Sequence, residues 1–502
     1  MANLLDRIER IGNRLPHPAV LFAAATVLVI VLSAIAASAG WAVAKPVPGE
    51  TLSTGAAGDI IAAQSLLTSD GIWWLLSNLV PNFLGFPPLG IVLVGMIGIG
   101  VAERSGFVPA LLSAIANAVS ARALTPTVVF LGIMSSVGLD AGYVVLPPIA
   151  AMLYILNDRS PIVGIAAAFA GISAGFSANL VITAVDPLMA GFTEAAAQFV
   201  DPTYRVAVTA NWWFMAASTV VLTLAGWAVT AMIVEPRAAL GDHPAVTDQP
   251  LDRSDHRAMR FALAALAVTG IAVALLIVIP DAPLHGVGRR FPRWVEATVP
   301  LLFIGFVVPG IVYGLVSGAF QNERDIADAM GRTLAELGPY IVLAFFAAQF
   351  IEAFKFSRLG EMLAITGGQA LTELAIPVWA LVAIFIIVVM FGNLLVGSAS
   401  AKYAFFAPVF VPMFMYVGIS PELTQVAYRV GDSITNVITP LNPYMVIIVA
   451  LVQRFVPSAG LGTVVALMLP YAAAFALVWM TMLLGWIAFG LPLGPGGGLH
   501  YG

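Results

Sequence analysis

The chain has 502 residues and a formal net charge of −5; 60% of its residues are hydrophobic and 10% are charged. Soluble domains carry about 25% charged residues, so this composition excludes an ordinary soluble domain and indicates a protein that lies in a lipid bilayer. The sequence has no cysteine, which excludes disulfides and thiolate metal sites, and its five histidines fall in polar connections or at the ends of apolar segments.

Apolar segments long enough to cross a bilayer as a helix, about 20 residues, recur along the chain. The first, residues 18–42, is too long for the core of a signal peptide, so we expect it to be a retained helix. The segments that predict membrane spans are residues 18–42, 87–103, 161–198, 205–235, 258–280, 297–319, 338–356, 421–456 and 460–490.

Two further apolar regions, residues 124–156 and 376–418, are too long for one span. Each has a polar, glycine-bearing middle, "SSVGLDAG" (Ser135–Gly142) in the first and "GNLLVGSASAK" (Gly392–Lys402) in the second. Irregular backbone at membrane depth is tolerated only where protein or a wet cavity covers it. We therefore expect two re-entrant helical hairpins that enter the membrane and turn back.

Polar residues also interrupt two of the spans. "SANLVITAVDP" (Ser177–Pro187) breaks the segment 161–198, and "SITNVITPLNP" (Ser433–Pro443) breaks the segment 421–456. Breaking a helix in the bilayer frees backbone groups that are costly to leave unpaired. The two interruptions therefore predict two broken helices.

The stretches before the two breaks resemble each other. When the second is laid over the first, Ala141 matches Ala401, Tyr143 matches Tyr403, Pro148 matches Pro408, and Ser160–Pro161 matches Ser420–Pro421. Both halves have the same order of helix, surface helix, hairpin, broken helix and helix, and the second starts on the opposite side of the membrane. This order predicts an inverted-topology repeat, the arrangement in which transporters hold solutes and ions at the midplane.

The predicted fold is thus an all-α, multi-pass membrane protein with about nine transmembrane helices and two hairpins. The expected parts are a first helix and outer loop (1–86), a first repeat (87–235), a linker (236–257), connecting scaffold helices (258–337), a second repeat (338–490) and a C-terminal tail (491–502). Most lysines and arginines fall in the loops on one side. By the positive-inside rule, we expect the N-terminus and the linker to be cytoplasmic.

The residues of the breaks are candidates for binding. Freed carbonyl groups, hydroxyls and amides could hold a small cation such as sodium, while half-helix N-termini favour anions. The alternative is that these side chains only cap and pack membrane helices. The candidates are Ser177, Asn179 and Thr183 in the first break and Ser433, Thr435, Asn436 and Thr439 in the second.

Ionisable residues within the membrane are expensive and need a partner or a wet cavity. They are Asp140, Asp186, Lys402, Arg429 and Asp432. Arg429 and Asp432 are three residues apart on one helical face and could simply pair with each other. In the functional interpretation, Arg429 or Lys402 meets a carboxylate of the solute, and Asp186 or Asp432 carries a coupling proton. Arg429 is the better clamp, because a guanidinium holds a carboxylate bidentately.

The segments "GSASAKYAFFAPVFVPMF" (Gly397–Phe414), "GISPELTQVAYRVGDSITNVITPLNPY" (Gly418–Tyr444) and "GISAGFSANLVITAVDPLMAGFTEAA" (Gly171–Ala196) resemble the AbgT family of bacterial inner-membrane transporters. The resemblance covers nearly the whole chain. It implies a homodimer, each subunit with an outer scaffold and an inner transport core, and a broader similarity to dicarboxylate/sodium elevator transporters. It also implies transport of p-aminobenzoyl-glutamate, or export of sulfonamide-type antimetabolites.

The resemblance assigns binding roles to Ser400, Pro421, Arg429 and Asp186. Where the family commonly has tryptophan, this sequence has Tyr403, whose phenol can still stack on an aminobenzoyl ring.

We therefore expect a secondary transporter for an aromatic carboxylate, coupled to protons or sodium, with no cofactor and no nucleic-acid partner. A sodium-coupled dicarboxylate symporter is the first alternative. An intramembrane hydrolase is remote, because it would need a histidine or paired aspartates at membrane depth.

Overall fold

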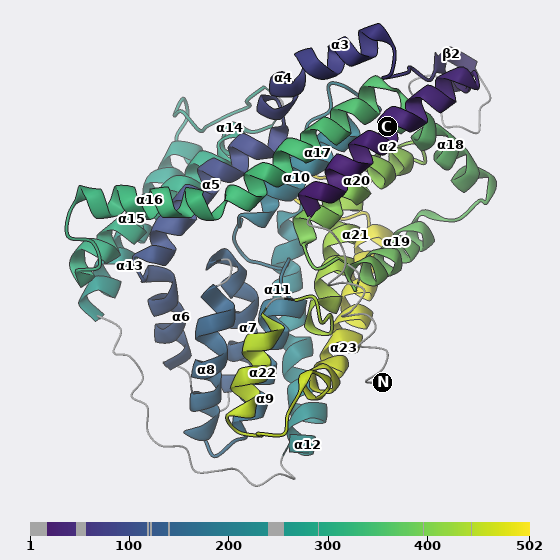
Figure 1. Ribbon diagram of the computed structural model, residues 1–502. Coiled ribbons are helices and arrows are strands. Elements are labelled where there is room, and N and C mark those ends of the chain that lie inside the picture. The colour runs from purple at the N-terminus through teal and green to yellow at the C-terminus, as the bar shows by residue number, and fades with distance from the viewer. Residues whose placement is uncertain are drawn as a thin grey trace.

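The computed structural model (Figure 1) describes residues 18–46, 57–117, 120, 123–138, 141–238, 256–289, 291–394, 396–442 and 444–502. Within these ranges the chain is mostly helical. One small antiparallel sheet, β1 (Ala42–Pro46) paired with β2 (Ala57–Ala62), departs from the all-α prediction, which had an outer loop there. Ile61 of β2 packs against Met362 and Ile365, so the pairing depends on residues far along the chain.

The first third of the chain begins with an apolar helix and ends with the helix that follows the first break. Its elements are α2 (Pro18–Ser38), α3 (Ser69–Ser77), α4 (Leu79–Leu84), α5 (Pro87–Arg104), α6 (Phe107–Asn117), α7 (Leu124–Met134), η2 (Ser135–Gly138), α8 (Ala141–Ile155), α9 (Pro161–Phe169), η3 (Ala170–Ala174) and α10 (Val185–Ala197).

The middle of the chain supplies long apolar helices and one surface helix. Its elements are α11 (Trp212–Val229), η4 (Thr230–Val234), α12 (Glu235–Ala238), α13 (His256–Val278), α14 (Arg293–Glu296), α15 (Thr298–Ser317) and α16 (Glu323–Glu336).

The last third repeats the order of the first. Its elements are α17 (Gly338–Phe356), α18 (Leu359–Glu373), α19 (Val378–Asn393), α20 (Ala399–Met415), α21 (Pro421–Ile434), η5 (Thr435–Val437), α22 (Met445–Gln453) and α23 (Leu461–Ala488). α2 and α17 lie side by side in Figure 1, and α11 packs along α23.

Six helices of the described ranges are long and apolar enough to cross a membrane: Ala19–Ser38, Trp212–Arg237, His256–Val278, Thr298–Ser317, Gly338–Phe356 and Leu461–Ala488. They match six of the predicted spans. The other three predicted spans correspond to α5 and to the broken helices α9–α10 and α21–α22, and their crossing of the membrane stays a prediction, as do the re-entrant hairpins.

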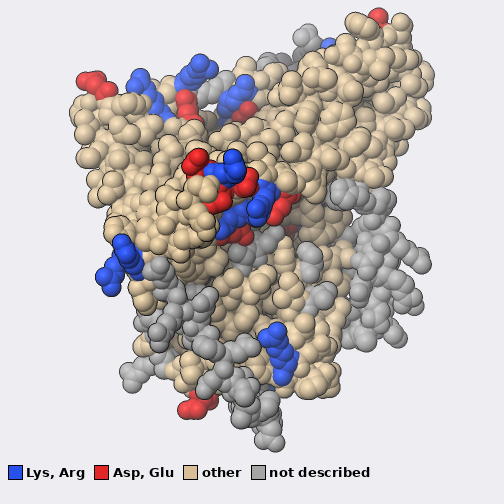
Figure 2. All heavy atoms as spheres, turned by 60° about the vertical axis from the view of Figure 1, so that its left-hand side comes forward, with Lys and Arg blue, Asp and Glu red and all other residues tan. Residues whose placement is uncertain are grey.

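The surface helix α16 forms where the sequence predicts it. The Asn322 side chain accepts hydrogen bonds from the backbone N–H groups of Arg324 and Asp325. The Asp325 side chain accepts one from the backbone N–H of Asn322, which completes a capping box. Figure 2 shows a largely uncharged face on which the charges gather over this region. Arg104 at the end of α5 pairs with Glu336 there, so α16 is fixed to the scaffold.

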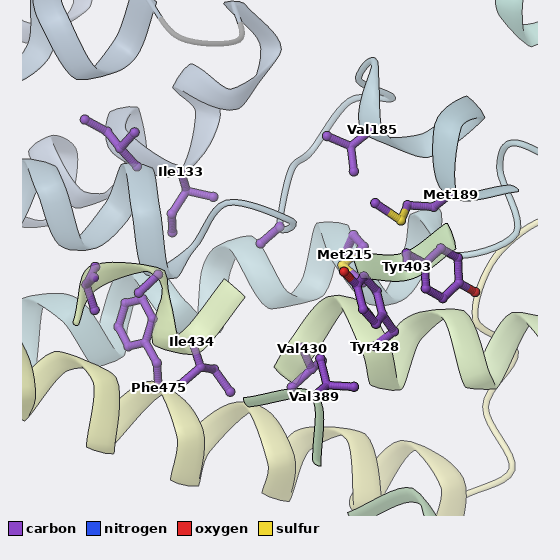
Figure 3. Close-up of a cluster of buried hydrophobic side chains, with 14 of the residues drawn as sticks. Ile133, Val185, Met189, Met215, Val389, Tyr403, Tyr428, Val430, Ile434 and Phe475 are labelled. Atoms are coloured by element: carbon purple, nitrogen blue, oxygen red, sulfur yellow. The ribbon is translucent and has the colours of Figure 1, made fainter. Parts of the chain in front are cut away.

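The second piece of each broken helix packs against helices of the other half. α10 follows the first break and packs against α20 and α21 of the second half, whereas α22 follows the second break and packs against α8 and α9 of the first half. Figure 3 shows part of the core where the halves meet, with Met189 beside Tyr403 and Tyr428. Neither half can complete its packing alone, and the functional residues lie at this junction.

Candidate functional site at the two helix breaks

The first break rests against the tip of the first helix pair. Residues 175–184 are not helical, and they follow the π-helical turn η3, whose wider ring already loosens the helix. Val181 donates its backbone N–H to Asn179 Oδ1 at 3.0 Å, and Asn179 Nδ2 donates to Ser136 Oγ of η2 at 3.0 Å. Asn179 therefore links the break to the turn between α7 and α8.

The second break is held by an asparagine at the end of α19. Asn393 Nδ2 lies within hydrogen-bond distance of the carbonyl of Asp432 (2.7 Å), Thr435 Oγ1 (2.8 Å) and Asn436 Oδ1 (2.8 Å). After η5 the chain leaves the helix until α22. Each break thus contacts the helix pair of its own half.

The two breaks also contact each other. The Ser177 N–H donates to Ser433 Oγ at 3.2 Å, and Asn442 Nδ2 donates to Ser173 Oγ at 3.0 Å. Ser433 in turn donates to the carbonyl of Arg429. The backbone freed by one break is therefore paired with side chains of the other.

A buried ion pair joins the halves. Arg429 Nη1 lies 2.7 Å from Asp186 Oδ1, and Arg429 Nη2 donates to the carbonyl of Ser177 at 2.9 Å. The other oxygen of Asp186 accepts from the N–H and the hydroxyl of Thr183 at 2.7 and 3.0 Å. Arg429 Nε is buried without a hydrogen-bond partner. The expected alternative, a pair between Arg429 and Asp432, is wrong.

Asp432 is instead paired with a lysine. Lys402 Nζ lies 2.6 Å from Asp432 Oδ1, and it also donates to Asn393 Oδ1 and, at 3.2 Å, to the carbonyl of Val396. Tyr428 donates to Asp432 Oδ1 at 3.1 Å and to the carbonyl of Ala399 at 2.6 Å. The ammonium thus occupies a cage of three oxygens, the environment that the sequence suggested for a small cation.

A cavity of about 430 Å³ lies at the junction. Its polar lining comes from Ser398, Ser400, Asn436 and Asn442, and its aromatic lining from Tyr143, Phe176, Tyr340 and Tyr444. Tyr143 and Tyr444 stack on each other across the halves at 4.1 Å between ring centroids. Val185 also lines the cavity, and Asp186 of the ion pair is the next residue along α10. Concave, mostly apolar sites with a few polar groups are typical of small-molecule binding.

Known proteins share both this sequence and this fold. Residues 3–501 match the model of the AbgT family of transporters. The chain belongs to the AbgT family. It is 35% identical to the p-aminobenzoyl-glutamate transport protein of Escherichia coli K12 over 505 residues, which covers 97% of this chain and 95% of that protein. The predicted membership is confirmed.

Two solved structures of this family are similar throughout. The Alcanivorax borkumensis YdaH transporter, described as having an unusual topology, is 42% identical, with a TM-score of 0.91 over 96% of this chain and all of that one. Neisseria gonorrhoeae MtrF, described as illuminating a class of antimetabolite efflux pumps, is 39% identical, with a TM-score of 0.90 over 98% of this chain and all of that one. The chain is therefore a multi-pass membrane protein of a transporter family.

The predicted site residues of this AbgT-family chain fall into three groups. Ser400 and Asn436 line the cavity. Those buried behind it, in the hydrogen-bond and ion-pair network, are Ser177, Asn179, Asp186, Lys402, Arg429, Asp432, Ser433 and Thr435. Asp140 lies outside the described residues.

Two predicted residues lie further from the cavity. Pro421 is the first residue of α21, buried in the core. Tyr403 is fully buried; its ring packs against Tyr428 at 4.3 Å, and its hydroxyl contacts Thr193 at 2.6 Å. The Tyr403 ring, which we expected to contact a solute, packs against Tyr428 in this conformation. Its role in binding stays a prediction.

Sequence reasoning missed several residues of the site. Asn393 lies in the polar middle of the second hairpin, and this position could have marked it as a candidate. Its three hydrogen-bond acceptors, however, are distant in sequence. Tyr340 is at the start of α17 and nothing in its local pattern marks it, yet its hydroxyl is buried without a partner at the cavity. Asn442 and Tyr444 end the second break.

Proposed function

We propose that this chain is a secondary active transporter that carries an aromatic, carboxylate-bearing solute across the bacterial inner membrane, driven by a proton or sodium gradient. The names of its relatives point to p-aminobenzoyl-glutamate and antimetabolites as solutes, and we expect sulfonamide-type compounds among the antimetabolites. The relatives are named as transporters and efflux pumps, which supports movement of the solute without chemical conversion.

The observation that carries the proposal is the cavity between the two breaks. Aromatic rings from both halves suit a planar ring, since aromatic pairs prefer offset or edge contacts. Ser398, Ser400, Asn436 and Asn442 suit its polar groups. This lining supports an aromatic solute over a small dicarboxylate.

The ion pair behind the wall suggests how a carboxylate is bound. Arg429 uses one nitrogen for Asp186 and one for a carbonyl, and its Nε is free. A solute carboxylate can replace Asp186 at this guanidinium, and the released Asp186 carboxylate then needs a proton or another cation, because a buried charge without a partner is costly. Binding therefore breaks an ion pair that joins the two halves.

Movement of the inner part against the scaffold, as in an elevator, completes the proposal. It is supported by the contacts that α10 and α22 each make with the opposite half, which join the two helix pairs into one body. The homodimer, the inverted repeat and the cytoplasmic N-terminus belong to the same proposal.

The test is counterflow in proteoliposomes with labelled p-aminobenzoyl-glutamate, with sodium and pH varied separately. We expect saturable counterflow that sulfonamides compete away and succinate does not. Because a hydrogen bond to a charged group contributes about 1.5–3 kcal/mol, Arg429→Lys should lower the apparent affinity for the solute by about tenfold to a hundredfold.

Arg260→Lys, on the exposed part of α13, is the matched control and should behave as the unmodified protein. Absence of counterflow would refute the proposed solute. A strict sodium requirement with competition by succinate would instead establish the dicarboxylate symporter.

A further inference from the structure

One buried carboxylate of the transport core takes no part in the site described above. Glu422 is the second residue of α21 and is 2% exposed. Its two carboxylate oxygens accept the hydroxyl of Tyr204 at 3.1 and 3.0 Å, and its backbone carbonyl accepts Asn211 Nδ2 at 3.1 Å. The sequence analysis did not select it, because it lies beside the Ser-Pro turn and not within a break.

Glu422 differs from the other two carboxylates in having no counter-charge. Asp186 is paired with Arg429 and Asp432 with Lys402, so those four residues are neutral together. In the part of the chain that the structure describes, Glu422 forms no ion pair. An ionised Glu422 would therefore leave one uncompensated negative charge in the core, and a buried charge without a partner takes up a proton instead.

Among the described residues, no group on a neighbouring element supplies that missing positive charge. Burial and the charge of Glu422 raise the pKa of the Tyr204 hydroxyl, so Tyr204 stays neutral. The neighbouring Arg205 is paired with Glu194 at 3.6 Å. Tyr403 of α20 is the other titratable group that faces Glu422, and it is also neutral at physiological pH.

The segment after α23 covers this end of α21 without adding a charge. Ser420 bonds to the carbonyls of Leu499 and Gly498, and Tyr501 packs against Tyr204. His500 pairs with Ile419 through the backbone only, and its side chain is exposed.

The N-terminus of α21 compensates Glu422 only in part. Pro421 has no N–H, the N–H of Leu423 bonds to Ser420 Oγ at 3.0 Å, and the N–H of Thr424 bonds to the carbonyl of Ser420 at 3.1 Å. The N–H groups of Leu423 and Thr424 are therefore already occupied, which leaves only the N–H of Glu422 itself and the Ser420 side chain to act on the carboxylate from this helix end.

A polar stripe connects Glu422 with the cavity. Glu422, Gln425 and Arg429 follow one another at spacings of three and four residues, on one face of a helix that is buried along its whole length. Gln425 Oε1 accepts from Thr193 at 2.8 Å, and Thr193 contacts the Tyr403 hydroxyl at 2.6 Å. The stripe ends at the Asp186–Arg429 pair, so a change of charge at Glu422 acts on the element that holds the carboxylate clamp.

We propose that Glu422 binds and releases the proton that couples solute movement to the pH gradient. This proposal rests on the proposed function. A proton from water forms an O–H bond on the carboxylate while the site faces one side, which neutralises the core for its movement. The bond breaks and the proton returns to water when the site faces the other side.

The first test compares two transport modes of Glu422→Gln in proteoliposomes with labelled p-aminobenzoyl-glutamate. Exchange at equal pH on both sides needs no net proton movement and should remain measurable, which shows that the variant folds and binds. Acceleration of net flux by a pH gradient should be lost. Glu194→Gln is the matched control: it changes a neighbouring glutamate that pairs with Arg205 and should retain the full response to the gradient.

The second test uses Tyr204→Phe and serves also if Glu422→Gln fails to fold. The Tyr204 hydroxyl donates to the carboxylate and so favours its charged form. Its removal should shift the midpoint of pH-dependent flux to higher pH by about one unit. An unchanged midpoint, or a normal gradient response in Glu422→Gln, overturns the assignment. Absence of any exchange in the unmodified protein would count against the proposed function itself.

Discussion

Tyr340 brings to the cavity a hydroxyl that has no hydrogen-bond partner among the residues that the structure describes. Its ring belongs to the scaffold helix α17, and its OH is buried without a partner while the ring lines the cavity. Buried polar groups normally have hydrogen-bond partners, and an exception needs an explanation. A solute that supplies the missing partner is the explanation we favour.

We expect Tyr340→Phe to leave the melting temperature in detergent unchanged or slightly higher, because no bond within the protein is lost. A neutral hydrogen bond contributes about 0.5–1.5 kcal/mol, so the apparent affinity for p-aminobenzoyl-glutamate should fall by about twofold to tenfold in counterflow.

Tyr416→Phe is its control. The Tyr416 hydroxyl is also buried without a partner, but Tyr416 does not line the cavity. Equal losses of affinity in both variants would argue against a bond between Tyr340 and the solute.

The charged residues of the site could be identified from the sequence, but their partners could not. Charge inside an apolar segment is expensive, so Lys402, Arg429, Asp432 and Asp186 were conspicuous. Spacing along one helix suggested that Arg429 meets Asp432. Asp432 is instead bound by Lys402 of the preceding hairpin, and Arg429 turns to Asp186 of the other half. Such choices depend on how distant elements pack, which local periodicity does not contain.

Glycines let the hairpin helices approach the helices before the breaks. A Cβ at Gly171 of η3 would lie 2.4 Å from the carbonyl oxygen of Val129 in α7, and one at Gly431 of α21 would lie 2.6 Å from that of Ile386 in α19. The same contact is thus built in both halves. Close backbone packing through small residues is the usual basis of helix association in membranes.

We expect Gly171→Ala and Gly431→Ala each to lower stability by about 1–3 kcal/mol, the usual cost of overpacking, measured as a lower melting temperature in detergent and reduced counterflow. Gly270→Ala on α13 is the control. Its new Cβ would meet nothing within 4 Å, so it should be neutral or stabilise the helix. A stable, active Gly171→Ala would mean that α7 can shift relative to η3 without cost.

The helix breaks and the turns within the two helix pairs were predictable because polar residues interrupt apolar runs there, while the re-entry of these pairs into the membrane stays a prediction. Asn179 and Asn436 both lie where the helix stops. The sheet β1–β2 was not predictable, because its strands are short and are supported by α18, hundreds of residues later. The starts of helices were better anticipated where a Ser-Pro pair sets them, as at α9 and α21.

The whole molecule depends on contacts between distant parts of the chain. The segment after α23 folds back, and the Leu493 carbonyl accepts the N–H of Phe214 at the start of α11. A Cβ at Gly497 would lie 1.9 Å from the carbonyl oxygen of Ala210, whereas one at Gly498 would meet only a carbonyl oxygen at 3.9 Å. Two adjacent glycines therefore differ completely in the space around them.

We expect Gly497→Ala to displace this segment and to lower stability by about 1–3 kcal/mol, with faster proteolysis beyond α23 as the direct readout. Gly498→Ala should match the unmodified protein in both melting temperature and proteolysis. Identical behaviour of the two variants would show that the segment is not held at Ala210.

The bonds from Ser420 to Leu499 and Gly498 also set an order of events during synthesis. α21 emerges from the ribosome long before the carbonyl groups that Ser420 binds, since α22 and the whole of α23 are translated in between. In a nascent chain arrested within α23, Ser420 still caps α21 through the N–H of Leu423, but its own N–H and hydroxyl lack the acceptors that Leu499 and Gly498 supply.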